Sequence, residues 1–194
     1  MIGIVDYGAG NIASVSNALA FIGCDASIVS SPGELDRCDG LVFPGVGSFG
    51  AMVETLEARS LYDPLKEKIS EGTPFLGICL GLQLLFDGSE ESPDHKGFGI
   101  FKGNAKRFSQ GKVPQIGWNS VEPVGGAISG GWAYFVHSYK IDECEHALAH
   151  TDYFGAYVSA VKKDNITALQ FHPEKSGPYG LSLLRWWTSC LQKE

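Results

Sequence analysis

Residues 74–86 read Pro-Phe-Leu-Gly-Ile-Cys-Leu-Gly-Leu-Gln-Leu-Leu-Phe, and this stretch decides the fold that the sequence predicts. The apolar run 74–78 is typical of a buried strand, and the apolar residues of 80–86 predict a helix directly after it. Gly77 and Gly81 flank Cys79 at the junction. Such a sharp strand-to-helix turn holds one side chain above the edge of a sheet.

The same succession of strand, glycine turn and helix occurs upstream of this stretch. Apolar residues 2–5 and 41–43 each precede a glycine-containing turn and a helical pattern. The second half of the chain reads instead as successive strands over 113–121, 133–141, 148–154, 157–162 and 167–171, with a final helix from about Gly180. We therefore predict an α/β fold with a doubly wound, mostly parallel central sheet and antiparallel additions in the C-terminal half.

Composition favours one globular domain over residues 1–194. The chain is 44% hydrophobic and 19% charged, and no composition shift or long linker divides it. Its formal net charge of -7 argues against nucleic-acid binding, which needs clustered Lys and Arg. We expect the partner to be a small molecule or a protein.

The cysteines and the apolar segments bear on compartment and cofactors. Five cysteines without paired spacings suggest neither a disulfide framework nor a zinc site, and we expect no metal or other cofactor. The first residues lack the pattern of a signal peptide, and no apolar stretch approaches about 20 residues. We expect a cytoplasmic protein that does not enter membranes.

The motif Gly77-Ile78-Cys79-Leu80-Gly81 has the form of a nucleophile elbow. At the start of a helix, the thiolate of Cys79 would face the positive end of the helix dipole, which favours the reactive form. The alternative is that Cys79 is only a small hydrophobic residue in an apolar run, as most free cysteines are.

Phe171-His172-Pro173-Glu174 follows the expected strand 167–171, which places an imidazole and a carboxylate at the same edge of the sheet as Cys79. A cysteine nucleophile needs a base that also returns the proton, and the base needs a carboxylate to orient it. Alone, His172 and Glu174 would read as a hydrogen-bonded strand end beside a surface acid. Together with Cys79 they favour a catalytic triad.

The elbow and the downstream His-Pro-Glu make the chain resemble the class I (triad-type) glutamine amidotransferases. The agreement covers Gly77 to Gln83 and Gln170 to Ser176, and the resemblance spans nearly the whole chain. It implies hydrolysis of glutamine to glutamate and ammonia through a γ-glutamyl thioester. In the implied roles, Cys79 is the nucleophile, His172 the acid and base, and Glu174 the group that orients His172.

The resemblance also implies the substrate-binding residues Gly45, Val46, Gly47, Leu80, Gln83, Ser138 and Tyr139. Backbone N–H groups of Leu80 and of the Val46 and Gly47 region would stabilise the oxyanion, and the glycines would allow a peptide flip there. Ser138 stands where Thr is more common, which keeps the hydroxyl. The alternative for 44–47 is an ordinary strand-to-helix turn.

Within that class, the segments 6–11, 44–47, 114–119 and 134–139 resemble the glutaminase subunits of imidazole glycerol phosphate synthases. The resemblance implies histidine biosynthesis and a heterodimer with a cyclase subunit that is a (β/α)8 barrel and receives the ammonia. We expect Asn11, Trp118 and Tyr134 to contribute to docking. Their alternatives are a helix cap for Asn11 and core positions for the two aromatic residues.

Three other functions remain open at this stage. Residues 8–13 match a dinucleotide fingerprint, although only weakly. The triad residue types also suit a cysteine hydrolase or peptidase. Finally, the chain could serve another amidotransferase, for aminodeoxychorismate, anthranilate, pyridoxal or guanylate synthesis.

Overall fold

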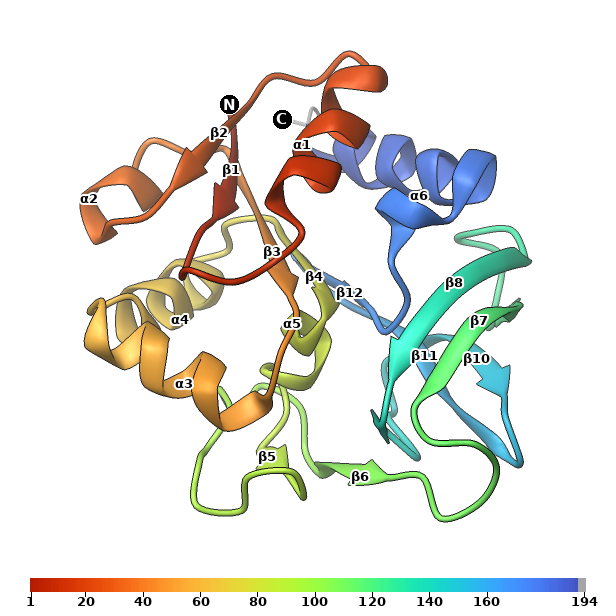
Figure 1. Ribbon diagram of the computed structural model, residues 1–194. Helices are drawn as coiled ribbons and strands as arrows, with labels where there is room; N and C mark the ends of the chain where they lie inside the picture. Colours follow the sequence, from red (N-terminus) through yellow and green to blue (C-terminus); the bar gives the residue numbers. More distant parts are fainter. Residues whose placement is uncertain (192–194) are drawn as a thin grey trace.

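The computed structural model describes residues 1–191 and has a nine-stranded mixed sheet as its centre (Figure 1). In spatial order the strands are β2 (Ala26–Val29), β1 (Ile2–Val5), β3 (Gly40–Gly45), β4 (Phe75–Cys79), β12 (Ile166–Leu169), β11 (Ala156–Lys163), β10 (Ala147–Asp152), β7 (Gln115–Pro123) and β8 (Gly131–His137). The first five strands of this order pair in parallel, and the other four continue the sheet in antiparallel fashion. The predicted fold class is confirmed.

Helices cover both faces of the parallel part (Figure 1). One face carries α1 (Ile12–Phe21) and α6 (Gly177–Cys190), and the other carries α3 (Phe49–Ala58) and α4 (Tyr62–Ser70). The short elements are the helices α2 (Pro32–Leu35) and α5 (Leu80–Gln83), the 3-10 helix η1 (Pro173–Lys175), and a small sheet of β5 (Gly88–Ser89), β6 (Asn104–Arg107) and β9 (Tyr139–Lys140).

The parallel strands are apolar on both sides because each side faces a layer of helices. On β3, Leu41 and Phe43 belong to the core under α3 and α4, whereas Val42 belongs to the core under α1 and α6. All six residues of β3 are buried. The strand next to the elbow is thus fixed from both faces.

The structure corrects several element boundaries. The helix expected over 80–86 ends at Gln83, because the carbonyls of residues 84–86 accept hydrogen bonds from the loop 98–100 instead of continuing the helix. The strand expected over 133–141 divides at Ser138 into β8 and β9, which lie in different sheets. The final helix begins at Gly177, earlier than predicted.

Candidate active site

Cys79 ends β4 and begins α5, and its backbone has φ 56° and ψ -106°. This is a strained conformation for a residue with a side chain and costs on the order of 1 to 3 kcal/mol. Glycines make the turn possible: a Cβ on Gly81 would lie 2.5 Å from the Phe43 carbonyl oxygen, and a Cβ on Gly77 would lie 2.5 Å from the Gly81 carbonyl oxygen. The elbow that the sequence predicts is therefore present.

The helix after Cys79 is shorter than expected. With only four residues, α5 has a much smaller dipole than the helix that the sequence suggested. The helix dipole therefore contributes less at Cys79 than the sequence predicted.

His172 lies just beyond β12, the parallel neighbour of β4, so the chain brings it to the same sheet edge as Cys79. The His172 Nδ1 and Glu174 Oε1 atoms are 2.8 Å apart, and the two side chains are 2% and 1% exposed. This contact orients the ring with Nδ1–H toward the carboxylate. The structure thus brings His172 and Glu174 together as the sequence predicts, and their roles as acid and orienting group stay a prediction.

Burial disfavours the charged form of His172, but interactions with Cys79 and Glu174 outweigh it and raise its pKa to about 9. The Nε2 atom has no hydrogen-bond partner of regular geometry among residues 1–191. Cys79 and His172 line the same cavity, and the thiol favours the charged form of the ring. A ring that is protonated near neutral pH can hold a thiolate and then give a proton to a leaving group.

Strand β8 holds the His172 backbone in place. The His172 N–H donates to the Tyr134 carbonyl at 3.0 Å, and the Ser176 hydroxyl donates to the His172 carbonyl at 2.6 Å. The Tyr134 N–H in turn donates to the Ser176 hydroxyl oxygen at 3.0 Å. A shift of β8 would therefore move the candidate base.

A cavity of about 330 Å³ opens beside Cys79 and His172. Six of the seven predicted substrate-binding residues line it, namely Val46, Gly47, Leu80, Gln83, Ser138 and Tyr139. The seventh, Gly45, lies opposite Cys79 in the β3–β4 register, where a Cβ would approach the Leu80 Cβ to 2.5 Å. Gly45 therefore shapes the elbow rather than the cavity wall.

Val46 departs from its predicted role in one respect. Its N–H donates to the buried Tyr7 hydroxyl at 3.3 Å, and Tyr7 does not line the cavity. In this structure the Val46 N–H is thus turned away from the cavity.

Sequence reasoning missed several polar groups around the cavity. Glu91 lines it and accepts a hydrogen bond from the Phe49 N–H at 2.7 Å. The buried Gln170 amide donates to the Cys79 Sγ at 3.7 Å. His137 also lines the cavity, and burial lowers its pKa to about 4, so it stays neutral. Gln170 lay inside the quoted motif, whereas Glu91 resembled an ordinary surface acid.

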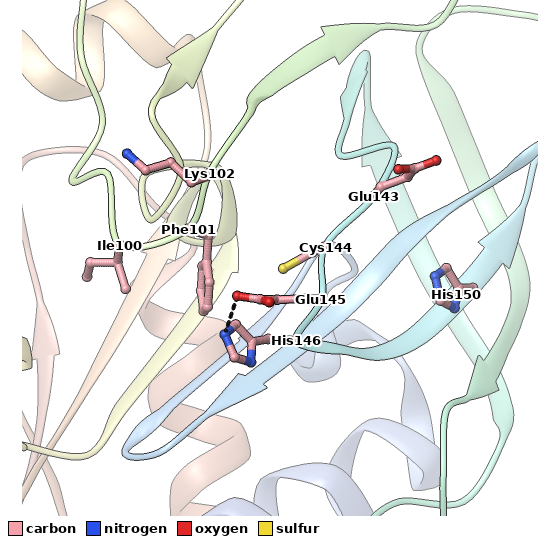
Figure 2. Close-up of a pocket in the computed structure, with 8 residues that line it drawn as sticks. All are labelled: Ile100, Phe101, Lys102, Glu143, Cys144, Glu145, His146 and His150. Carbon is pink, nitrogen blue, oxygen red and sulfur yellow. Dashed lines mark ion pairs between the residues drawn. The ribbon is translucent and has the colours of Figure 1, made fainter.

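A larger hollow of about 690 Å³ lies elsewhere and does not include Cys79 (Figure 2). Its His146 Nε2 is 3.1 Å from Glu145 Oε1, and burial raises the pKa of the Cys144 thiol, which disfavours a thiolate. The smaller cavity is therefore the better candidate for chemistry.

The predicted docking residues do not take the alternative roles. Trp118 is 55% exposed, so it is not a core residue, and its ring meets the half-buried Tyr134 edge-to-face with centroids 6.3 Å apart. Asn11 stands at the N-cap of α1 but its side chain makes no capping hydrogen bond. Trp118 and Tyr134 thus pack on each other at the surface, and their part in docking stays a prediction, as does that of Asn11.

Within residues 1–191, no three His, Cys, Asp or Glu side chains are grouped so that they could hold a metal ion. No helix in that range is long and apolar enough to cross a membrane.

Comparison with known proteins places the chain in a family. The family model of class I glutamine amidotransferases matches residues 3–188. The chain belongs to this family. Among the amidotransferase's relatives is the imidazole glycerol phosphate synthase subunit HisH of Thermococcus kodakarensis, 46% identical over 95% of this chain and 97% of that protein. HisH proteins of Desulfitobacterium hafniense and Aquifex aeolicus are 42% and 44% identical, covering 95% and 93% of this chain and 92% of each relative.

Solved structures share the amidotransferase's fold at low sequence identity. A glutamine amidotransferase crystal structure matches with a TM-score of 0.81 and 19% identity, covering 99% of both chains. The PurLQS structure from Thermotoga maritima matches with a TM-score of 0.77 and 19% identity, covering 98% of both chains. At such identities the likeness concerns the fold alone.

Proposed function

We propose that this amidotransferase is the glutaminase subunit of an imidazole glycerol phosphate synthase and acts in histidine biosynthesis. The observation that carries the proposal is the buried Cys79, His172 and Glu174 arrangement at a cavity, in a chain more than 40% identical to several HisH proteins over nearly its full length. Glutamine is the substrate, and a cyclase subunit receives the ammonia.

In the first half-reaction, the Cys79 thiolate attacks the side-chain amide carbon of glutamine. His172 then donates its proton to the departing nitrogen, which leaves as ammonia, and a γ-glutamyl thioester remains. In the second half-reaction, His172 takes a proton from water, which attacks the thioester and releases glutamate. Glu174 keeps the ring oriented and stabilises its charged form.

Groups on the cavity wall suit the other parts of glutamine. The Leu80 N–H follows the nucleophile and serves as one oxyanion donor, and the 46–47 backbone supplies another once it faces the cavity. The Glu91 carboxylate suits the α-ammonium group of glutamine. The Gln83 Oε1 atom is buried without a hydrogen-bond partner in the described chain and can accept one from the substrate, with Ser138 and Tyr139 nearby.

Ammonia is mostly protonated near neutral pH, so direct transfer to a second active site preserves its reactivity. We propose a heterodimer with a (β/α)8-barrel cyclase, in which Asn11, Trp118 and Tyr134 contribute to docking. The hydrogen bonds between the backbone of β8 and His172 would pass a change at that surface to the base.

We also propose a cytoplasmic location and a single glutaminase domain. The five free cysteines suit a reducing compartment, which supports this location. The family match over 3–188 supports one domain.

The test measures glutamate release from glutamine by this chain alone, and with a candidate cyclase and its nucleotide substrate. We expect strong stimulation by the partner. Cys79→Ala should abolish turnover and preserve partner binding, whereas the matched control Cys144→Ala, in the larger hollow, should keep full activity. Substantial turnover by folded Cys79→Ala, or no partner stimulation of the unsubstituted chain, would refute the proposal.

A further inference from the structure

Two buried glutamine side chains connect the sulfur of Cys79 to the wall of the cavity. The Gln170 Nε2 donates to the Cys79 Sγ at 3.7 Å, and the Gln170 Oε1 accepts from the Gln83 Nε2 at 3.2 Å. Both glutamines are buried, and Gln83 lines the cavity. A chain of two side-chain amides therefore runs from the sulfur to a residue of the cavity wall.

A backbone carbonyl fixes the orientation of both amides. The Gln83 Nε2 also donates to the Tyr139 carbonyl at 3.1 Å, and a carbonyl oxygen can only accept. The nitrogen of Gln83 must therefore face Tyr139, and its second hydrogen meets the Gln170 Oε1. The atom of Gln170 that faces the sulfur is then its nitrogen. The Tyr139 carbonyl is itself held by the ring of His137, whose Nδ1 lies 2.8 Å from it.

Gln170 favours the charged form of Cys79. The Cys79 S–H can donate to the Val136 carbonyl at 4.0 Å, which favours the thiol. The Gln170 N–H acts in the opposite sense, because a hydrogen bond donated to the anion stabilises it. A neutral amide offers this donor at every pH, whereas His172 loses its proton as the pH rises through its pKa of about 9.

The other end of the amide chain leaves one atom free for a ligand. Both hydrogens of the Gln83 Nε2 are used, and the Gln83 Oε1 is buried without a hydrogen-bond partner among residues 1–191. Gln83 therefore offers a ligand in the cavity an acceptor and no donor.

We propose that Gln170 is a further catalytic residue: it donates to the Cys79 sulfur and at the same time holds Gln83 so that the Gln83 Oε1 can accept from glutamine. This inference rests on the proposed glutaminase function. Without the Gln170 amide, the thiolate loses a donor and the Gln83 amide is free to rotate.

Gln170→Met removes both polar atoms and keeps a side chain of similar size. Iodoacetamide reacts with the thiolate, so its rate at Cys79, followed by mass spectrometry of the peptide, measures the thiolate fraction. Near neutral pH we expect this rate to fall about 10- to 100-fold, the factor for one hydrogen bond to a charged group. The difference should narrow toward about pH 10, because high pH ionises thiols in both proteins. The exposed Cys190 should keep its rate and serves as the reference in the same sample.

Steady-state kinetics separate the two ends of the amide chain. In Gln170→Met, kcat of partner-stimulated hydrolysis should fall about 10- to 100-fold and KM should rise about 3- to 10-fold. In Gln83→Met, KM should rise as well, but alkylation of Cys79 should change less than about threefold, because the Gln170 donor remains.

Gln115→Met is the matched control. Gln115 is also a buried glutamine, and its Oε1 accepts from the Tyr157 hydroxyl at 3.0 Å, but it does not line the cavity. We expect this control to leave Cys79 alkylation, kcat and KM unchanged. An equal fall in the control overturns the inference, since the effect would then reflect damage to the core rather than loss of a donor.

A measurement on the unsubstituted chain does not depend on the folding of Gln170→Met. In proton–nitrogen NMR spectra, the side-chain amide signals of Gln170 and Gln83 should both move when Cys79 ionises, and this step should be absent from Cys79→Ala. Amide signals that do not respond to Cys79 overturn the inference.

The outcomes also separate this inference from the proposed function. Unchanged alkylation of Cys79 in Gln170→Met, with partner-stimulated hydrolysis intact in the unsubstituted chain, overturns the Gln170 inference alone. Absence of glutamate release from the unsubstituted chain with and without its partner overturns both.

Discussion

Two residues of the candidate site adopt states that are unfavourable for them elsewhere, one in its backbone angle and one in its charge. Cys79 keeps a positive φ, and His172 keeps a proton in a buried place. Gly77 and Gly81 permit the close backbone approach at the turn, and Cys79 together with Glu174 favours the charged form of His172. The spacing and residue types of Cys79, His172 and Glu174 are distinctive, so the sequence predicts that they come together, and in the structure they do. The Tyr7 contact instead joins positions 7 and 46, which no local pattern connects.

Glu174→Gln should change the pH dependence of stability and activity. Because the pKa of His172 is about 9 in the folded chain and 6.5 ordinarily, its protonation stabilises the fold below pH 6.5, and this contribution is lost as pH rises through 9. We expect the free energy of unfolding to fall by on the order of 1 to 3 kcal/mol over that range, and by less in Glu174→Gln, whose His172 has a lower pKa. Urea unfolding between pH 6 and about 10 measures it.

In the same variant, kcat should fall by about two to four orders of magnitude, because the neutral amide no longer holds the His172 charge. The matched control is Glu145→Gln, which alters an exposed His–Glu contact of 3.1 Å at His146. That change should leave stability and kcat as they were. Equal pH profiles for Glu174→Gln and the unsubstituted chain would contradict the assigned role of Glu174.

At the scale of elements, the sequence predicts that a strand and a helix meet at Cys79, but not where helix α5 ends. The sequence shows the strand, the elbow and a helix start. It does not show that N–H groups of the loop 98–100 donate hydrogen bonds to the carbonyls of 84–86 and so end α5 early, because those bonds join distant segments.

Helix α4 was not predicted for another reason. Among its nine residues only Leu65 and Ile69 are buried, so its apolar stripe is narrow and gives a weak helical pattern.

The tight contact of α5 with β3 leads to a stability prediction for Gly81→Ala. The added Cβ would meet the Phe43 carbonyl oxygen at 2.5 Å and its ring at 3.0 Å, so the elbow would have to shift, at a cost of about 1 to 3 kcal/mol. Gly33→Ala is the matched control, since nothing lies within 4 Å of its Cβ position on α2. If urea denaturation showed equal midpoints for the two variants, the packing argument would fail.

At the scale of the whole molecule, the two edges of the central sheet differ in how they are connected to the candidate site. The order β2-β1-β3-β4-β12-β11-β10-β7-β8 puts β4 and β12, which lead to Cys79 and His172, in the middle, and β2 and β8 at the edges. Sequence alternation predicted the antiparallel strands of the C-terminal half, but not their order in space, which depends on long-range pairing. The β8 edge is the one connected to the site, because Val136 lines the cavity and the Tyr134 carbonyl holds His172.

Because the β8 edge is connected to the candidate site, we expect a partner to bind at the β7–β8 surface. Trp118→Glu places a charge on the exposed β7–β8 surface and should weaken binding of a cyclase partner by about 30-fold or more, as loss of an aromatic anchor does. Ile28→Glu, on β2 at the opposite edge, is matched in exposure, 57% against 55% for Trp118, and should change affinity less than about twofold. Titration calorimetry compares the two, with partner-free glutaminase activity as the measure of an intact site. Equal affinities for both variants would mean that the partner does not use the β7–β8 surface, and the ammonia would then have to leave the Cys79 cavity by another side of the molecule.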